Sequence, residues 1–166
     1  MATDDQIEQL KAAMVKNTMK SVDTERWKPL MNQLGLTDEE MVERLVRLLL
    51  IHLVMDRTIT AVLTVKLVKE NPTAFDEVES ELVRLNLSSR IRLVKACAAV
   101  SDSCANDMHE VNNVRNRFSH YDPKLQGGLA AVKEIASGQE FEKFIQKAGG
   151  TIEEMGKAIG LPFKQS

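Results

Sequence analysis

Three residues in the stretch VRNRFSHYDP, residues 114–123, could together handle a phosphate group. Arg115 supplies a permanent positive charge for phosphate oxygens, and His120 supplies an imidazole that exchanges a proton near neutral pH. Asn116 directly follows the arginine and stands four residues before the histidine, so Asn116 and His120 share one helix face. On spacing alone, the favoured interpretation is an ordinary helix end whose Asn and His side chains make C-terminal hydrogen bonds.

The helix expected to carry this stretch, residues 104–120, has an apolar side and an unusual polar side. On a helical wheel the apolar side consists of Val111, Val114, Phe118 and Tyr121. Amides and imidazoles replace the usual Lys and Glu on the polar side: His109, Asn112, Asn113, Asn116 and His120. Because asparagine is a poor helix former, this side costs helix stability, which a polar interface or a bound anion would offset. A second copy of this helix crossing here would bring two such sets together.

The composition favours helices packed on helices. Of the 166 residues, 43% are apolar and only 4% aromatic, with four prolines, so the sequence predicts one all-α domain over residues 1–166. The formal net charge is −2 and the pI is about 6.0. A protein that coats duplex DNA is usually basic overall, so any contact with nucleic acid must be local.

Several features predict a cytoplasmic protein. The first residues show no basic and apolar signal pattern, and the longest strictly apolar run in the richest stretch is 48–51, so no membrane span is expected. Cys97 and Cys104 have no further Cys or His partners at zinc-ligand spacing. We therefore expect free thiols in a reducing compartment, and neither a metal nor a cofactor.

A long central helix is the clearest predicted element. Thr37 and Glu40 form a capping box, and neither Gly nor Pro follows until residue 72. Residues 38–71 therefore form one helix about 50 Å long, or two helices if the chain breaks near 58–60. His52 lies within the apolar surface of this helix and is interpreted as a core histidine, because no second ligand lies at helical spacing.

Shorter helices are expected on both sides of a core at about residues 37–123. Residues 4–34 should hold two N-terminal helices, the second containing Trp27 and ending at Gly35. After the turn at Asn71 and Pro72, one helix covers 75–85, and Ser88 or Ser89 caps the next, which reaches Val100. A turn at 101–103 precedes the 104–120 helix, which the Asp122–Pro123 pair ends. Three short breaks, at Gly127–Gly128, Ser137–Gly138 and Gly149–Gly150, then divide the C-terminal extension, residues 124–166. They give three helices: 129–136, 139–148 and 151–159.

The stretch LNLSSRIRLVKACAAVSDSCANDMHEVNNVRNRFSHYDP, residues 85–123, resembles the core of the HEPN superfamily. The hallmark of that superfamily is an Arg, a polar residue directly after it, and a His four to six positions beyond. Arg115, Asn116 and His120 match this pattern. The helix beginning LSSRIRLVKA is most similar to the branch that includes the mannitol operon repressor. The resemblance covers about residues 40–123.

The resemblance implies a bundle of four or five helices that forms a homodimer through the 104–120 region, with both motifs facing a shared cleft. In catalytic members the motif supports metal-independent RNA cleavage. Carried over, His120 is the acid/base for attack by the ribose 2′-hydroxyl, Arg115 holds the phosphate, and Asn116 orients either. A local set of RNA- or phosphate-binding residues would assist them: Arg117, Arg90, Arg92, Lys95, Asn112 and Asn113. Asp56 on the long helix could pair with Arg115.

A second hypothesis belongs to another functional class. Many members of the superfamily are scaffolds, nucleotide binders or regulators, and the mannitol-repressor branch is linked to transcriptional control. The same dimer cleft would then bind a protein partner or a small ligand, as in a transcriptional regulator, and no RNA would be cut. The position of His120 separates the two, because a His120 side chain buried against backbone groups would exclude the enzyme.

Overall fold

The computed structural model describes residues 13, 24–69, 72–122, 124 and 128–160. All regular elements in these residues are helices, so the predicted all-α bundle with a long central helix and C-terminal helices is confirmed. Besides the central helix, the elements are η1 (Thr24–Trp27), α2 (Lys28–Leu34), η2 (Pro72–Ala74), α4 (Phe75–Arg84), α5 (Leu87–Ala96), α6 (Asp102–Ser119), α7 (Gly128–Ala136) and α8 (Gly138–Ala158).

The central helix, α3 (Asp38–Leu67), begins at the predicted capping box. The Thr37 hydroxyl accepts a hydrogen bond from the Glu40 backbone amide at 3.2 Å. The Glu40 carboxylate accepts one from the Thr37 backbone amide at 2.7 Å. These two bonds satisfy amides that the first helical turn leaves unpaired. The open question of one helix or two is settled, because α3 runs without a break through residues 58–60.

Burial accounts for the continuity of α3 at the β-branched residues 58–60, because Ile59 and Thr60 are no more than 2% exposed. Thr58 donates its hydroxyl to the Val54 carbonyl at 2.8 Å, and Thr60 donates to the Asp56 carbonyl at 2.9 Å. Both hydroxyls thus find partners within the helix, one turn earlier.

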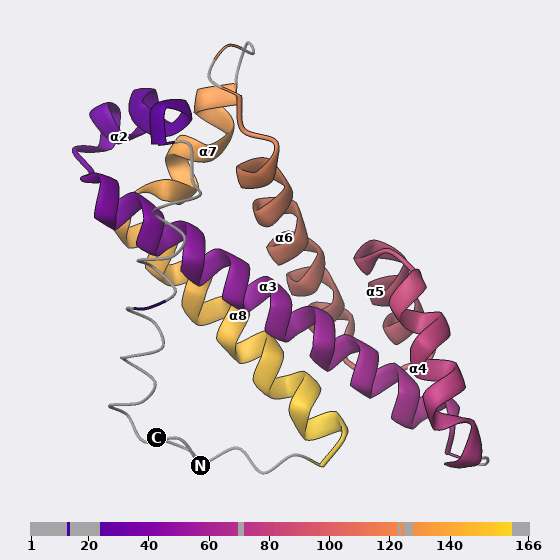
Figure 1. Cartoon of the computed structure of the whole chain (residues 1–166). Coiled ribbons are helices and arrows are strands. Elements are labelled where there is room, and N and C mark those ends of the chain that lie inside the picture. The colour runs from indigo at the N-terminus through magenta and orange to yellow at the C-terminus, as the bar shows by residue number, and fades with distance from the viewer. Residues whose placement is uncertain (1–12, 14–23, 70–71, 123, 125–127, 161–166) are drawn as a thin grey trace.

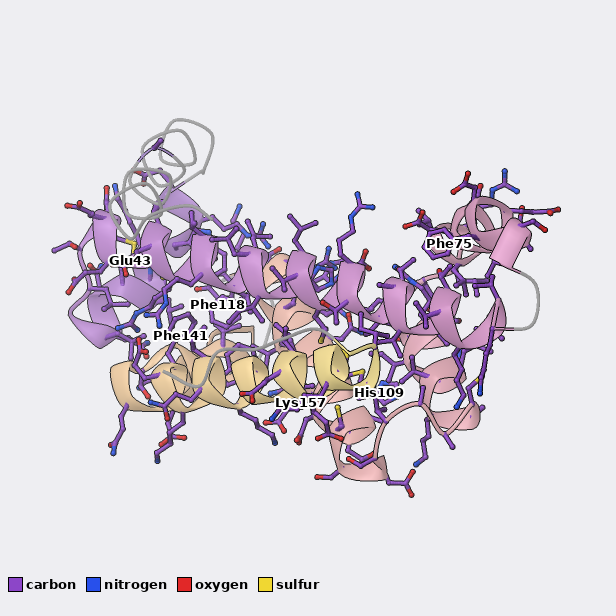
Figure 2. The ribbon with its side chains drawn as sticks, turned by 90° about the horizontal axis from the view of Figure 1, so that it is seen from below. Glu43, Phe75, His109, Phe118, Phe141 and Lys157 are labelled. Atoms are coloured by element: carbon purple, nitrogen blue, oxygen red, sulfur yellow. The ribbon has the colours of Figure 1, made fainter. Side chains whose placement is uncertain are left out.

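The other helices pack around α3. It contacts α4, α5, α6 and α8, and α8 runs alongside α3 in both general views (Figure 1, Figure 2). A continuous set of buried apolar side chains joins all these helices, from Trp27 near the N-terminal end of the described chain to Met155 in α8. The predicted apolar side of α6 lies in this core, with Val111, Phe118 and Tyr121 each no more than 2% exposed.

Trp27 anchors the C-terminal end of α6 to the start of the described chain. Its ring stacks on Tyr121, with 4.6 Å between centroids, and lies 6.0 Å from the ring of Phe118. Such pairs add to the burial of apolar area. Gly35 ends α2 at φ 65°, in the left-handed region that favours glycine, which confirms the predicted helix stop.

The helices around the candidate motif start earlier than the sequence suggested. Asn86, rather than Ser88 or Ser89, caps α5, and its side chain accepts the Ser89 amide at 2.9 Å. Ser101 caps α6 by accepting the Cys104 amide at 3.1 Å, so residues 102–103 are helical and the predicted turn at 101–103 is wrong. In both cases a polar side chain earlier in the sequence caps the helix by accepting a free backbone amide of its first turn.

The C-terminal helices differ from the prediction at one place. The structure has one helix, α8, over Gly138–Ala158, where we predicted a break at Gly149 and Gly150. Apolar side chains on both sides of the glycine pair lie on one buried face of α8: Phe141, Phe144, Ala148 and Met155. Burial of this face outweighs the weak helix propensity of the two glycines.

Some expectations concern parts of the chain outside the described residues. They are the N-terminal helix beginning at residue 4, the role of Pro123 in ending α6, and the contribution of Gly127 to the first turn of the C-terminal extension.

By length and composition, α3 is able to cross a bilayer, because its most apolar 18 residues have a mean hydropathy of 1.7. The same window is 39% buried inside the protein, and α3 packs against four other helices. Central helices of globular domains meet these two criteria as readily as membrane spans. The absence of a membrane span therefore stays a prediction.

Replacing Gly149 and Gly150 by Ala should stabilise the protein. Both glycines are exposed in a helix, and a Cβ added at either meets no atom within 4 Å. Each substitution removes about 0.5–1 kcal/mol of helix penalty, so the double variant should melt about 2–8 °C higher. Gly35→Ala is the matched control and should lower the melting temperature, because Gly35 has a positive φ. A lower melting temperature for the double variant would contradict this account of α8.

Candidate functional site

A pocket of about 280 Å³ lies where α3, α5 and α6 meet. It contains two residues of the sequence motif, Arg115 and Asn116. All of its lining residues except Leu87 carry a polar side chain: His52 and Asp56 from α3, Asn86, Leu87 and Ser88 at the start of α5, and Asn112, Arg115 and Asn116 from α6. Its size is close to the lower limit of about 300 Å³ for small-ligand sites, which suits a phosphate with at most part of a nucleotide.

Arg115 keeps hydrogen-bonding capacity for a ligand in this pocket. One terminal nitrogen, Nη1, donates to the Asn116 side-chain oxygen at 2.9 Å. A guanidinium carries five N–H groups, and this is the one hydrogen bond that the Arg115 side chain makes to another described residue. The residue is half-buried and lines the pocket, so an anion that enters would meet a positive charge and further terminal N–H donors.

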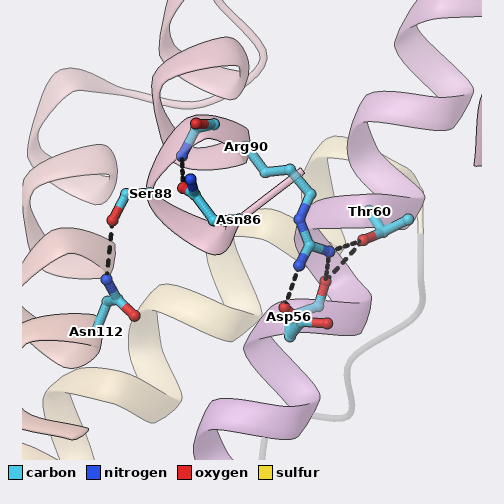
Figure 3. Close-up of polar contacts among 7 residues, drawn as sticks. Asp56, Thr60, Asn86, Ser88, Arg90 and Asn112 are labelled. Carbon is cyan, nitrogen blue, oxygen red and sulfur yellow. Dashed lines mark hydrogen bonds and ion pairs between the residues drawn. The ribbon is translucent and has the colours of Figure 1, made fainter. Parts of the chain in front are cut away.

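The ion pair beside this pocket involves a different arginine from the one expected. Arg90 is 5% exposed, and its guanidinium bonds to the Asp56 carboxylate and the Thr60 hydroxyl (Figure 3). It also donates to the Asp56 carbonyl at 3.3 Å. Asp56 therefore pairs with Arg90 and not with Arg115, and Arg90 ties α5 to α3 where we had predicted a phosphate contact at the surface.

His52 is the pocket residue whose role the sequence interpretation missed. It was interpreted as a core histidine, but its side chain is half-buried and lines the pocket with Arg115 and Asp56. Burial, and next the positive charge of Arg115, lower the pKa of His52, while Asp56 opposes them. Both effects favour the neutral imidazole. The available signal was the four-residue spacing of His52 and Asp56, which share a helix face.

The asparagine-rich side of α6 divides between interior and surface. Asn112 is 6% exposed and donates to the Ser88 hydroxyl at 3.1 Å, which links α6 to α5 (Figure 3). Asn113, its neighbour, is exposed. The wheel placed both residues opposite the core, and this is corrected for Asn112, because α5 covers that position and supplies a polar partner.

His120 lies at the end of α6, outside the set of pocket-lining residues. It is exposed, and its backbone amide donates to the Asn116 carbonyl at 2.9 Å as the helix ends. Arg26 holds the backbone on both sides of it, by bonding to the Ser119 carbonyl at 3.2 Å and to the Tyr121 carbonyl. Arg26 carries no recognisable signal in the sequence, because its partners are more than ninety residues away along the chain.

The remaining cations of the predicted set do not join Arg115. Arg117 is exposed and lines a second pocket, of about 320 Å³, with Lys143 and Lys147 of α8. Arg92 and Lys95 are exposed on α5. Arg92 donates a hydrogen bond to the Ser89 hydroxyl at 3.3 Å, and the Lys95 ammonium nitrogen lies 3.3 Å from a carboxylate oxygen of Asp102. The structure thus brings Arg115, Asn116 and Asn112 together and places the other cations elsewhere.

Substituting Arg90 tests its ion pair with Asp56, which lines the pocket. Arg90→Leu leaves the Asp56 carboxylate partly buried without its partner, so the free energy of unfolding should fall by about 2–4 kcal/mol. Urea denaturation measures the change. Arg92→Leu, at an exposed position of the same helix, should change it by no more than about 0.5 kcal/mol. Equal effects of the two variants would show that the Arg90 network contributes little.

Comparison with protein-family models, with curated proteins and with solved structures finds no match. Among the described residues, no three His, Cys, Asp or Glu side chains form a group able to hold a metal ion.

Proposed function

We propose that this protein is a HEPN-like, dimeric RNA-binding protein that holds an RNA phosphate in the pocket between α3, α5 and α6. The observation that carries the proposal is the joint position of Arg115 and Asn116 in this pocket, where the Arg115 guanidinium makes one hydrogen bond, to Asn116. Phosphate oxygens accept hydrogen bonds from a guanidinium and an amide at once.

The charge balance of the pocket supports an anionic ligand. The one carboxylate in its lining, that of Asp56, is already paired with Arg90, so the positive charge of Arg115 is not cancelled. The whole chain carries a net charge of −2, which disfavours a long run of phosphate contacts. One phosphate of a single-stranded RNA, where the backbone can approach a small pocket, fits both facts.

Cleavage is the activity that the resemblance adds to binding. In our proposal the His120 imidazole takes the proton of a ribose 2′-hydroxyl as that oxygen attacks phosphorus, and a 2′,3′-cyclic phosphate forms while the 5′-oxygen leaves. His120 of a second copy gives the leaving oxygen its proton. The exposure of His120 supports this role, whereas burial would have argued against it.

Arg115 and His120 act at different phosphates in this proposal. They are five residues apart, about 7.5 Å along the axis of α6, and His120 does not line the Arg115 pocket. Arg115 would hold one phosphate of an extended RNA strand, and another phosphate of that strand would lie at His120 of the same copy or of the facing copy in the dimer.

One observation favours the alternative of a regulatory interaction module. α3 exposes a group of large apolar side chains to solvent: Leu49, Leu53 and Val54, each 45–53% exposed. Exposed apolar groups of this kind commonly mark contacts with other proteins. A protein that acted through this face would keep its partner when Arg115 is replaced, and RNA would have no effect on it.

Substituting Arg115 tests RNA binding. With a fluorescent 2′-O-methyl oligoribonucleotide, which cannot be cleaved through its 2′-oxygen, Arg115→Ala should weaken binding about 10–100-fold. It should also reduce the steepness of the salt dependence by about 0.7. Arg117→Ala removes a cation that lines the other pocket of α6 and should change the affinity less than twofold. Equal losses for the two variants, or no binding by wild type, would refute a phosphate site at Arg115.

Substituting His120 tests cleavage separately from binding. Incubation with single-stranded RNA in EDTA should give 2′,3′-cyclic phosphate ends with wild type and at least a 100-fold lower rate with His120→Ala. His109→Ala replaces another histidine of α6 and should leave the rate unchanged. Equal rates for wild type and His120→Ala, or no cleavage by either, would refute the nuclease activity and leave the binding proposal to the affinity measurements.

A further inference from the structure

His52 and Arg115 line the same small polar pocket. His52 comes from α3 and Arg115 from α6, and the pocket has a volume of about 280 Å³. An imidazole and a guanidinium in one pocket can bind a phosphate, because together they offer a planar set of donors and a further N–H. His52 is 68 residues upstream of His120 and lies outside the stretch that carries the sequence motif.

The charges around His52 come from every helix that forms the pocket. On its own helix stands Asp56, one turn further on, and the two cations facing it are Arg115 from α6 and Arg90 from α5. Arg90 is paired with Asp56, so the carboxylate is engaged and Arg115 is the charge that His52 meets unbalanced. Protonating His52 would then place two positive charges in one pocket.

An anion reverses this situation. A phosphate between the two side chains cancels the charge of Arg115 and accepts a hydrogen bond from the imidazolium. Burial and then the charge of Arg115 lower the pKa of His52, and a phosphate beside Arg115 removes the second of these effects. Protonation of His52 and entry of the phosphate therefore favour each other.

We propose that His52 and Arg115 bind one RNA phosphate together, and that the pocket takes up one proton on His52 as the phosphate enters. This inference rests on the RNA-binding function proposed above and adds a residue and a pH dependence to it. The proton comes from the buffer, and no bond to phosphorus changes in this step.

The pH dependence of RNA affinity tests the proposal. A 2′-O-methyl oligoribonucleotide with a 5′-hydroxyl end has no phosphate that titrates between pH 5.5 and 8.5, so any change belongs to the protein. Over the interval between the pKa values of His52 in the free and bound states, the dissociation constant should rise about tenfold per pH unit for wild type. For His52→Gln it should be nearly independent of pH and weaker than wild type at pH 6.

His109→Gln is the matched control, since His109 lies on α6, outside the pocket lining and outside the proposed catalytic set. It should keep the pH dependence of wild type. A flat profile for wild type, or a profile for His52→Gln as steep as that of wild type, would overturn the role of His52. If Arg115→Ala still weakens binding in that case, the RNA-binding function stands without it.

A measurement on wild type with sulfate keeps the test independent of RNA and of variant folding. Sulfate mimics phosphate and does not titrate above pH 5, so NMR can follow the imidazole signals of the three histidines with and without it. The apparent pKa of His52 should rise with sulfate, whereas the imidazole signals of His109 and His120, which do not line the pocket, should respond much less to it. A shift of His52 without any RNA affinity would keep the anion site and refute the RNA function, while no shift of His52 would refute the anion site itself.

Discussion

The buried ion pair between Arg90 and Asp56 determines what the rest of the pocket can do. It joins α5 to α3, and the Thr60 hydroxyl accepts a further hydrogen bond from the Arg90 guanidinium. Without Arg90, the Asp56 carboxylate would be an unpaired negative charge in the pocket that Arg115 lines, and the two charges would cancel. Because a buried ion pair contributes little net stability once desolvation is counted, its main consequence here is electrostatic: it leaves Arg115 unopposed.

The pocket depends on contacts between helices that are far apart in the sequence. Arg90 reaches across 34 residues to Asp56, and Asn112 reaches across 24 residues to Ser88. Helix propensity, capping and periodicity are local properties and carry no information about which polar side chains meet. The sequence could therefore predict that Arg115 and Asn116 lie near each other. It could not predict that His52 would line the same pocket or that Arg90 would form an ion pair with Asp56.

Elements set by local chemistry were predictable, and elements set by packing were less so. The capping box at Thr37 and the left-handed Gly35 decide the ends of their helices within a few residues, and both predictions are confirmed. The pair Gly149–Gly150 looked equally local, yet α8 continues through it because its buried face extends on both sides. The wheel similarly identified the core side of α6 correctly but treated every polar position as surface, which fails for Asn112.

The two ends of the motif lie in different environments, and this bears on any chemistry at α6. His120 is exposed at the end of α6, where Arg26 binds the Ser119 and Tyr121 carbonyls on either side of it. His52 instead lines a small pocket, where burial and then the charge of Arg115 lower its pKa. An RNA phosphate beside Arg115 would thus act on the histidine in the pocket, although the histidine at the helix end is the one that belongs to the sequence motif.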